Sequence, residues 1–208
     1  MLLPPLYPIL DVDAAAASGH DLVQCAAGFA SLGLDLQQLR AKSLPGGDMV
    51  RLAERLVAVV PRLIINDRAD VALLTGAAGV HLGQEDLPLP AARSLKPDWI
   101  IGFSTHSPHQ AAHVLTQAPD YLAMGPVAET RSKLKPDAVV GVKALSMLKP
   151  ACTVPLVAIG GITLANCGEA WRAGADAVAV IAGLWGTPDP VAAAERFLLA
   201  FRNVSCHN

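Results

Sequence analysis

Two carboxylates near the middle of the chain occupy positions that suit a metal ion. Asp67 ends the apolar run 62–67, and Asp86 follows the next apolar run, 79–83. If both runs are neighbouring strands of a parallel sheet, the two carboxylates lie at one edge and can share a hard cation. Water molecules and substrate oxygens would complete the coordination of that cation. The pair therefore predicts Mg²⁺ beside a diphosphate, although each aspartate alone is equally suited to capping the helix that follows it.

The run Gln38-Leu39-Arg40-Ala41-Lys42 carries polar groups of another kind. Side chains alternate in direction along a strand, so Gln38, Arg40 and Lys42 fall on the same side. An arginine fork, a lysine point charge and an amide together suit a phosphate or pyrophosphate group. The alternative interpretation is a solvated loop after a strand that ends in arginine.

Later segments offer further places for a phosphate. The pair Gly160-Gly161 follows the seventh apolar run, and Gly183 follows the eighth. Glycines at such positions let backbone N–H groups approach a phosphate, although a glycine pair also suits an ordinary turn. The polar segment 134–140 has the character of a loop that closes over a substrate.

Two other polar residues, His81 and Ser104, stand within or at the end of apolar runs. We interpret His81 as a packed, hydrogen-bonded residue inside the fold rather than a metal ligand. Ser104 ends its run and therefore belongs with the candidate site residues.

Eight short apolar runs can position these residues, and many are nearly continuous and β-branched, as strands buried on both faces are. The expected strands are 6–11, 34–40, 62–67, 79–83, 99–104, 121–126, 154–160 and 177–181. The expected helices are 20–32, 49–59, 69–74, 108–116, 164–173 and 191–202. Gly33, Gly76 and Gly174 follow helices and suit left-handed C-terminal caps.

This alternation implies parallel strands joined by right-handed crossovers. Eight such strands favour a single closed (β/α)8 TIM barrel, with an open doubly wound sheet as the alternative. We expect one domain over residues 1–208, with a short C-terminal tail from about 203 to 208. In such barrels the chemistry lies at the carboxyl ends of the strands, where the polar residues above fall.

Composition narrows the class of protein. Hydrophobic residues make up 52% and charged residues 16%, which argues against disorder. The net charge of −2 argues against general binding to nucleic acid or anionic membranes, and no uninterrupted apolar run is long enough to span a bilayer. The four cysteines form no C-x-x-C pair, so we expect them to be reduced in a cytoplasmic protein. The sequence is compatible with a homo-oligomer as well as with a monomer.

Taken together and in order, these segments resemble the thiamine phosphate synthase family. The resemblance covers nearly the whole chain and rests on the motifs Gln38-Leu39-Arg40-Ala41-Lys42, Ile65-Asn66-Asp67-Arg68, Gly79–Leu87, Ile101-Gly102-Phe103-Ser104, Gly125-Pro126, Thr130-Arg131-Ser132-Lys133 and Ala158–Ile162. It implies that the chain joins a pyrimidine diphosphate to a thiazole phosphate, with Mg²⁺, and releases pyrophosphate.

The resemblance also implies a role for each matching residue. Asp67 and Asp86 would bind Mg²⁺. Arg40, Lys42, Lys133 and Ser104 would take part in catalysis. Substrate contacts would come from Gln38, Leu39, Arg40, Ala41, Lys42, Asn66, Ser104, Thr130, Ser132, Lys133, Gly161, Ile181 and Ala182.

The chain departs from the family pattern at two positions. Ser132 stands where a second threonine is common, which keeps the hydroxyl. Ala182 stands where a serine is expected beside the thiazole phosphate, and the loss of one hydroxyl contact costs on the order of 1 kcal/mol.

Three other functions compete with the synthase. A thiazole tautomerase of the same fold would use a histidine near the end of the sixth strand, where this chain has Pro126. A non-catalytic paralogue that binds thiamine precursors would lose the metal carboxylates and pyrophosphate cations, all of which are present. A Schiff-base aldolase needs a lysine inside a strand, and the expected strands have none.

Overall fold

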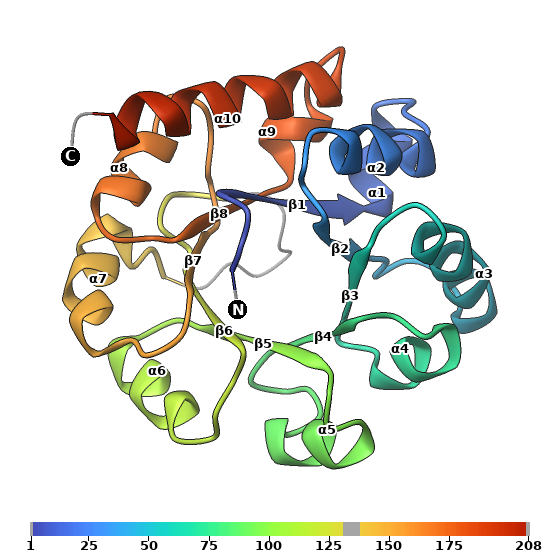
Figure 1. Cartoon of the computed structure of the whole chain (residues 1–208), viewed down its shortest axis with the longest axis horizontal. Coiled ribbons are helices and arrows are strands. Elements are labelled where there is room, and N and C mark those ends of the chain that lie inside the picture. Colours follow the sequence, from blue (N-terminus) through green and yellow to red (C-terminus); the bar gives the residue numbers. More distant parts are fainter. Residues whose placement is uncertain (1, 131–137, 207–208) are drawn as a thin grey trace.

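The computed structural model describes residues 2–130 and 138–206. Eight parallel strands form a closed barrel in sequence order, in which β1 pairs with both β2 and β8. Figure 1 looks along the barrel and shows the helices as an outer ring. The expected (β/α)8 barrel is therefore confirmed, and the open sheet is excluded.

The strands are β1 (Leu6–Asp11), β2 (Leu36–Arg40), β3 (Arg62–Asn66), β4 (Gly79–Leu82), β5 (Ile100–Thr105), β6 (Tyr121–Met124), β7 (Leu156–Ile159) and β8 (Ala177–Val180). The helices are α1 (Val12–Ala17), α2 (Leu22–Ser31), α3 (Gly46–Val57), α4 (Ala69–Thr75), α5 (Leu89–Leu95), α6 (Pro108–Leu115), α7 (Gly141–Leu148), α8 (Cys167–Arg172), α9 (Ala182–Trp185) and α10 (Pro190–Ser205), with a short 3-10 turn at Lys149–Ala151.

Alternation along the strands divides the core into two parts. Side chains that point outward pack against the helices in one large cluster, whereas a smaller cluster fills the inside of the barrel. The interior cluster consists of Tyr7, Ile9, Leu36, Ile64, Tyr121, Ala123, Val157, Ala177 and Ala179. Because the strands are parallel and in register, the next inward positions along them reach the carboxyl-end mouth of the barrel.

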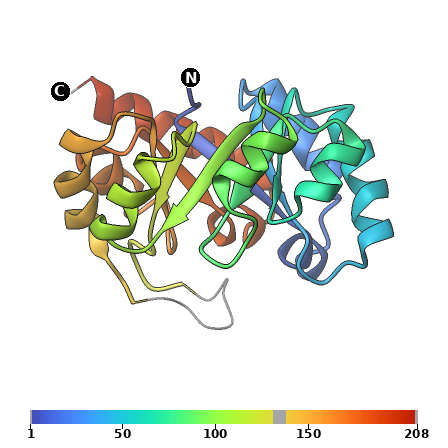
Figure 2. The same ribbon diagram turned by 90° about the horizontal axis from the view of Figure 1, so that it is seen from below.

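The two ends of the barrel serve different purposes. In Figure 2 the strand arrows point away from the end at which the N-terminal segment and the end of α10 lie. The loops that follow the strands therefore gather at the opposite end, which is the mouth. The expected site residues follow or end strands, so the fold brings them to this mouth.

The structure corrects several expected boundaries. The run 34–40 is a strand only from Leu36, and the run 154–160 is a strand only over Leu156–Ile159. Helix α10 continues to Ser205, three residues beyond the expected helix end at 202. Helices α1, α5, α7 and α9 were not anticipated, because each has only four to eight residues.

Other expectations about local structure are confirmed. Gly33, Gly76 and Gly174 have positive φ angles of 83°, 67° and 99°, as left-handed caps require. The four cysteines are free thiols. None of the eight strands contains a lysine, and in the described part of the chain no helix is long and apolar enough to cross a membrane.

Candidate active site

The two predicted metal ligands lie at neighbouring strand ends. Asp67 follows β3 directly, and Asp86 lies in the loop after β4. The Asp86 carboxylate accepts a hydrogen bond of 2.7 Å from the Gly83 N–H. Burial raises the pKa of Asp86, and the nearby Asp67 carboxylate adds to the shift, while the Gly83 N–H opposes it. The two carboxylates are therefore close enough to repel each other.

Neither carboxylate caps a helix. Arg68 is the N-cap residue of α4 and Pro88 that of α5, and neither cap has a side-chain hydrogen bond. The capping alternative is thus wrong for both aspartates.

The backbone at Asp67 also has an unusual conformation. Its φ is 62°, in the left-handed region that residues with a β-carbon rarely adopt, and its N–H donates to the His81 carbonyl at 2.9 Å. Strain of this kind persists where a site needs a fixed side-chain direction. Two carboxylates held together in this way fit a hard divalent cation, which would offset their mutual repulsion.

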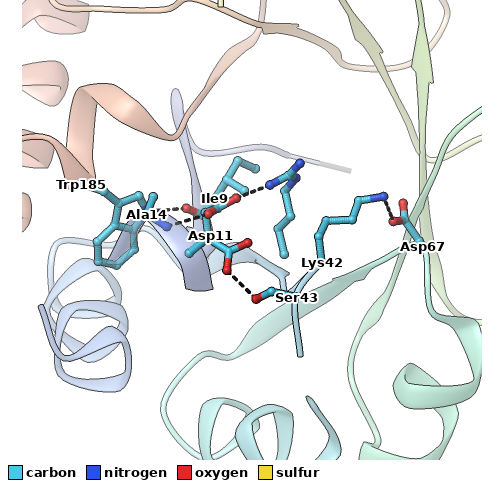
Figure 3. Close-up of polar contacts among 9 residues, drawn as sticks. Ile9, Asp11, Ala14, Lys42, Ser43, Asp67 and Trp185 are labelled. Atoms are coloured by element: carbon cyan, nitrogen blue, oxygen red, sulfur yellow. Dashed lines mark hydrogen bonds and ion pairs between the residues drawn. The ribbon is translucent and has the colours of Figure 1, made fainter. Parts of the chain in front are cut away.

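A cation of the chain already lies beside this pair. Lys42 Nζ is 2.5 Å from Asp67 Oδ2, and the lysine side chain is 56% exposed, so it remains accessible to a ligand. Figure 3 shows Lys42 reaching across to Asp67 from the neighbouring strand end. A hollow beside the pair is lined by Ala41, Lys42, Leu44, Met49, Asn66, Asp67 and Arg68. The structure thus brings Lys42, Asn66 and Asp67 to one place.

Arg40 has a partner that sequence reasoning missed. The strand register pairs Asp11 with Arg40 at the ends of β1 and β2. The Arg40 guanidinium donates to the Asp11 carboxylate, which is buried and also accepts the Ala14 N–H at 2.9 Å as the N-cap of α1. The sequence signal was an aspartate that ends the first apolar run, but only the register shows which residue it meets.

The end of β1 is fixed further by a tryptophan. Trp185 Nε1 donates to the Ile9 carbonyl at 2.8 Å from the buried side of α9. Figure 3 shows this indole beside the strand end that carries Asp11. This hydrogen bond anchors the strand backbone two residues before the carboxylate that holds Arg40.

Ser104 and Gln38 lie at two ends of a buried polar network. His81 contacts Ser104 Oγ through Nε2 and the Tyr121 hydroxyl through Nδ1, each at 2.8 Å. Gln38 Nε2 donates to the Tyr7 hydroxyl at 3.2 Å. The interpretation of His81 as a packed, hydrogen-bonded residue is confirmed.

The other side of the mouth is formed by β6, β7 and β8. Gly161 has a φ of 68°, and a β-carbon there would lie 2.4 Å from the Glu129 carbonyl oxygen, so the two loops pack backbone to backbone. Ala182 is exposed at the start of α9, and Ile181 before it is half-buried. These positions lie on neighbouring loops.

Some predicted residues are placed differently or lie elsewhere. Leu39 is fully buried in the outer core, so only its backbone can reach a substrate. Ala41 lines the hollow near Lys42. Thr130 is half-buried and has a partner in the structure. Ser132 and Lys133 lie outside the described residues.

The fold and the mouth together define a class. A single closed (β/α)8 barrel that gathers carboxylates, cations and amides at the carboxyl ends of its strands has the arrangement of a barrel enzyme. The sides of this mouth come from at least six different strands or the loops after them.

Comparison with known proteins identifies the family. The sequence model described as thiamine monophosphate synthase matches residues 6–184. A thiamine-phosphate synthase of Koribacter versatilis is 41% identical over 94% of this chain and 95% of its own, and one of Methanospirillum hungatei is 38% identical over 92% and 95%. The solved thiamine phosphate pyrophosphorylase of Pyrococcus furiosus superimposes with a TM-score of 0.85 at 30% identity over 96% of both chains. The chain belongs to the thiamine monophosphate synthase family.

Proposed function

We propose that this chain joins 4-amino-2-methyl-5-hydroxymethylpyrimidine diphosphate to thiazole phosphate, yielding thiamine phosphate and pyrophosphate. The bond between the pyrimidine methylene carbon and the diphosphate oxygen breaks, and its electron pair leaves with pyrophosphate. The thiazole nitrogen lone pair then forms the new carbon–nitrogen bond. The observation that carries the proposal is the cluster of Lys42, Asp67 and Asp86 at the mouth, in a chain of this family.

The leaving pyrophosphate is the group that most needs stabilisation, because negative charge builds on its oxygen as the bond breaks. Lys42 lies beside the carboxylate pair. The Asp11 carboxylate, at the end of β1, holds the Arg40 guanidinium at the end of β2. Preorganised cations of this kind stabilise a developing anion. Asp67 and Asp86 would hold Mg²⁺, which when bound supplies further positive charge to the diphosphate. In this proposal Lys133, which follows β6 in the sequence, would add a further cation.

The pyrimidine would lie between Ser104 and Gln38 at the mouth. Its amino group can delocalise the positive charge left on the ring as pyrophosphate departs, so no protein nucleophile is needed. The chain's contribution to bond formation is then to hold the two substrates in line. Asn66, in the hollow beside Lys42, would contact the diphosphate end.

The thiazole phosphate would take the opposite side of the mouth. Gly161, Ile181 and Ala182 would offer backbone N–H groups there, and the proposal adds the hydroxyls of Thr130 and Ser132. Ala182 lacks the hydroxyl that the family pattern places at this position, so the backbone has a larger share of the contact. These substrates are the proposed partners, and we propose a cytoplasmic location for the reaction.

The tautomerase is the second candidate, and one observation bears on it. Pro126 lies two residues after β6 and cannot transfer a proton, but His106 from the loop after β5 reaches the same segment, with Nδ1 2.6 Å from the Gly125 carbonyl. A tautomerase would interconvert thiazole carboxylate phosphates without releasing pyrophosphate. Pyrophosphate release that requires both precursors supports the synthase. Isomerisation without release, lost in His106→Gln, would support the tautomerase instead.

A further inference from the structure

A continuous line of hydrogen bonds crosses the inside of the barrel. It runs from Gln38 on β2 through Tyr7, Tyr121 and His81 to Ser104 on β5. The four distances are 3.2 Å from Gln38 Nε2 to Tyr7 Oη, 2.9 Å from Tyr7 Oη to Tyr121 Oη, 2.8 Å from Tyr121 Oη to His81 Nδ1 and 2.8 Å from His81 Nε2 to Ser104 Oγ. We name this line of five residues the interior relay. Both of its ends are proposed substrate contacts.

The interior relay is built into the packing of the barrel. Its first four members are at most 5% exposed. The Tyr121 ring stacks on His81 with centroids 5.5 Å apart and meets the Tyr7 ring edge-on at 5.7 Å. A β-carbon at Gly102 would lie 1.9 Å from Tyr121 Cζ, so the missing side chain there makes the room that lets the phenol cross to His81.

The protons in the interior relay can run in only one direction at its start. The Gln38 amide nitrogen is a donor, so the Tyr7 oxygen accepts from it. The remaining partner of the Tyr7 hydroxyl in the described chain is Tyr121, which must therefore receive the Tyr7 proton. The alternative leaves a buried hydroxyl proton without an acceptor, which is costly.

The same reasoning carries the direction onward. Tyr121 accepts from Tyr7, and its contact with Gln38 is to an amide donor, so its own proton goes to its acceptor partner, His81 Nδ1. A neutral imidazole that accepts at Nδ1 bears its proton on Nε2, and that nitrogen faces Ser104 Oγ. Ser104 then accepts from His81. Within the described residues no further side chain or carbonyl accepts the Ser104 hydroxyl proton, which leaves it for a ligand at the mouth.

We propose that the interior relay fixes His81 as the Nε2–H tautomer and thereby presents the Ser104 hydroxyl as a hydrogen-bond donor to a substrate atom. This inference rests on the proposed function for the identity of that atom, which is a ring nitrogen of the aminopyrimidine. A ring nitrogen with a lone pair accepts such a bond, whereas a C–H or N–H at the same place does not. His81, Tyr121 and Tyr7 are positioning residues in this proposal.

The two tyrosines are suited to such a role because they stay neutral. Burial raises the pKa of Tyr7, and it raises the pKa of Tyr121 well above the ordinary value. A neutral phenol keeps both its proton and its acceptor oxygen, so the direction of the interior relay holds over the range in which enzymes of this kind work.

The direct test is the tautomer of His81 in the ligand-free protein. Protein labelled with ¹⁵N-histidine is observed by long-range ¹H–¹⁵N correlation at about pH 8, where an ordinary imidazole is neutral. The His81 signal is assigned from its loss in His81→Gln. The proposal requires a proton on Nε2. A proton on Nδ1 in the wild-type protein would overturn it.

Two conservative variants separate the interior relay from general packing. Tyr121→Phe removes the donor to Nδ1, so the His81 signal should shift toward a mixture of tautomers. Tyr7→Phe removes the same atom one step further back, and Tyr121 can still donate to His81, so the Nε2–H form should persist. An unchanged tautomer in Tyr121→Phe, or equal changes in the two variants, would contradict the proposal.

Steady-state kinetics distinguishes the interior relay from a general loss of core packing, which would affect both substrates. Tyr121→Phe should raise KM for the pyrimidine diphosphate about tenfold and leave KM for thiazole phosphate nearly unchanged. In a Ser104→Ala background the same change should add little, because it acts through Ser104. Additive losses would overturn the interior relay. The tautomer is measured without substrate, so its result does not depend on turnover. A wild-type protein that forms no product would reject the proposed function, whereas the tautomer measurement would still decide whether the interior relay exists.

Discussion

Lys42 and Asp67 form an ion pair between the neighbouring ends of β2 and β3 at the barrel mouth, with Nζ 2.5 Å from Oδ2. In the proposed reaction these two groups have different ligands, since the lysine serves the diphosphate and the carboxylate serves Mg²⁺. The substrate-free pair therefore keeps each group near the position it needs while neutralising its charge. In the proposed reaction, binding of Mg²⁺ and the diphosphate would exchange this contact for two others.

Asp67→Asn should abolish Mg²⁺-dependent product formation, with a loss of about 10²-fold or more, and should change the thermal unfolding midpoint little. The carboxylate lies at the mouth and contributes little packing, so its loss affects the cation rather than the core. Activity is measured across a Mg²⁺ titration. Asp48→Asn is the matched control, because Asp48 is an exposed aspartate that pairs with Arg51 on the surface of α3. Full activity of Asp67→Asn in the presence of EDTA would remove the metal assignment.

Asp11→Asn should lower kcat/KM for the pyrimidine diphosphate about tenfold. The buried carboxylate fixes the direction of the Arg40 guanidinium, and an amide keeps the shape but loses the charge that holds it. The amide oxygen can still accept the Ala14 N–H, so α1 keeps its cap. Steady-state kinetics with each substrate varied checks this prediction.

Asp13→Asn is the control for that variant, since Asp13 is exposed two residues further on and contacts Ser43 instead. It should keep wild-type kinetics. Equal losses in the two variants would show that the segment as a whole, and not the contact with Arg40, is responsible.

Alkaline pH provides a test of the barrel interior. Tyr7 and Tyr121 are the only two tyrosines of the chain, and both have pKa values raised by burial. Each group therefore contributes stability that is fully present below the unfolded pKa of about 10 and is lost as pH rises toward the folded value. Ultraviolet titration should show no tyrosinate in the folded protein at about pH 10, and the unfolding midpoint should fall above that pH. A tyrosinate band from folded protein at about pH 10 would contradict the burial of the interior relay.

Ala182→Ser should tighten the apparent affinity for thiazole phosphate by up to about tenfold. The variant restores a hydroxyl at an exposed position where the proposal relies on backbone N–H groups alone. KM for thiazole phosphate is the measurement, with KM for the pyrimidine diphosphate as the internal control. A large loss of activity would mean that this pocket is shaped for another ligand.

The sequence was sufficient for the barrel and for most of the mouth, for a simple physical reason. Alternation of apolar runs and amphipathic stretches specifies the βα order, and the period of two along β2 places Gln38, Arg40 and Lys42 on one side. It could not show that Asp11 meets Arg40, because that contact depends on the register between β1 and β2.

The sequence could not predict the interior relay either, because it also depends on contacts between strands. His81 was interpreted as a packed residue, but its partner Tyr121 comes from a strand that is not adjacent to β4. The contact exists only because Gly102 on the intervening β5 leaves room for the phenol ring. Likewise, the sequence could not predict the left-handed backbone at Asp67, because aspartate tolerates that conformation better than most residues but adopts it only where the tertiary structure requires it.

The most direct test of the proposed function is a single-turnover reaction of the wild-type protein with both phosphorylated precursors and Mg²⁺. Thiamine phosphate and pyrophosphate are quantified together over time. The proposal predicts that the two products appear in equal amounts, that both precursors are required and that EDTA prevents the reaction. Failure of the folded wild-type protein to form thiamine phosphate under these conditions would contradict the synthase assignment.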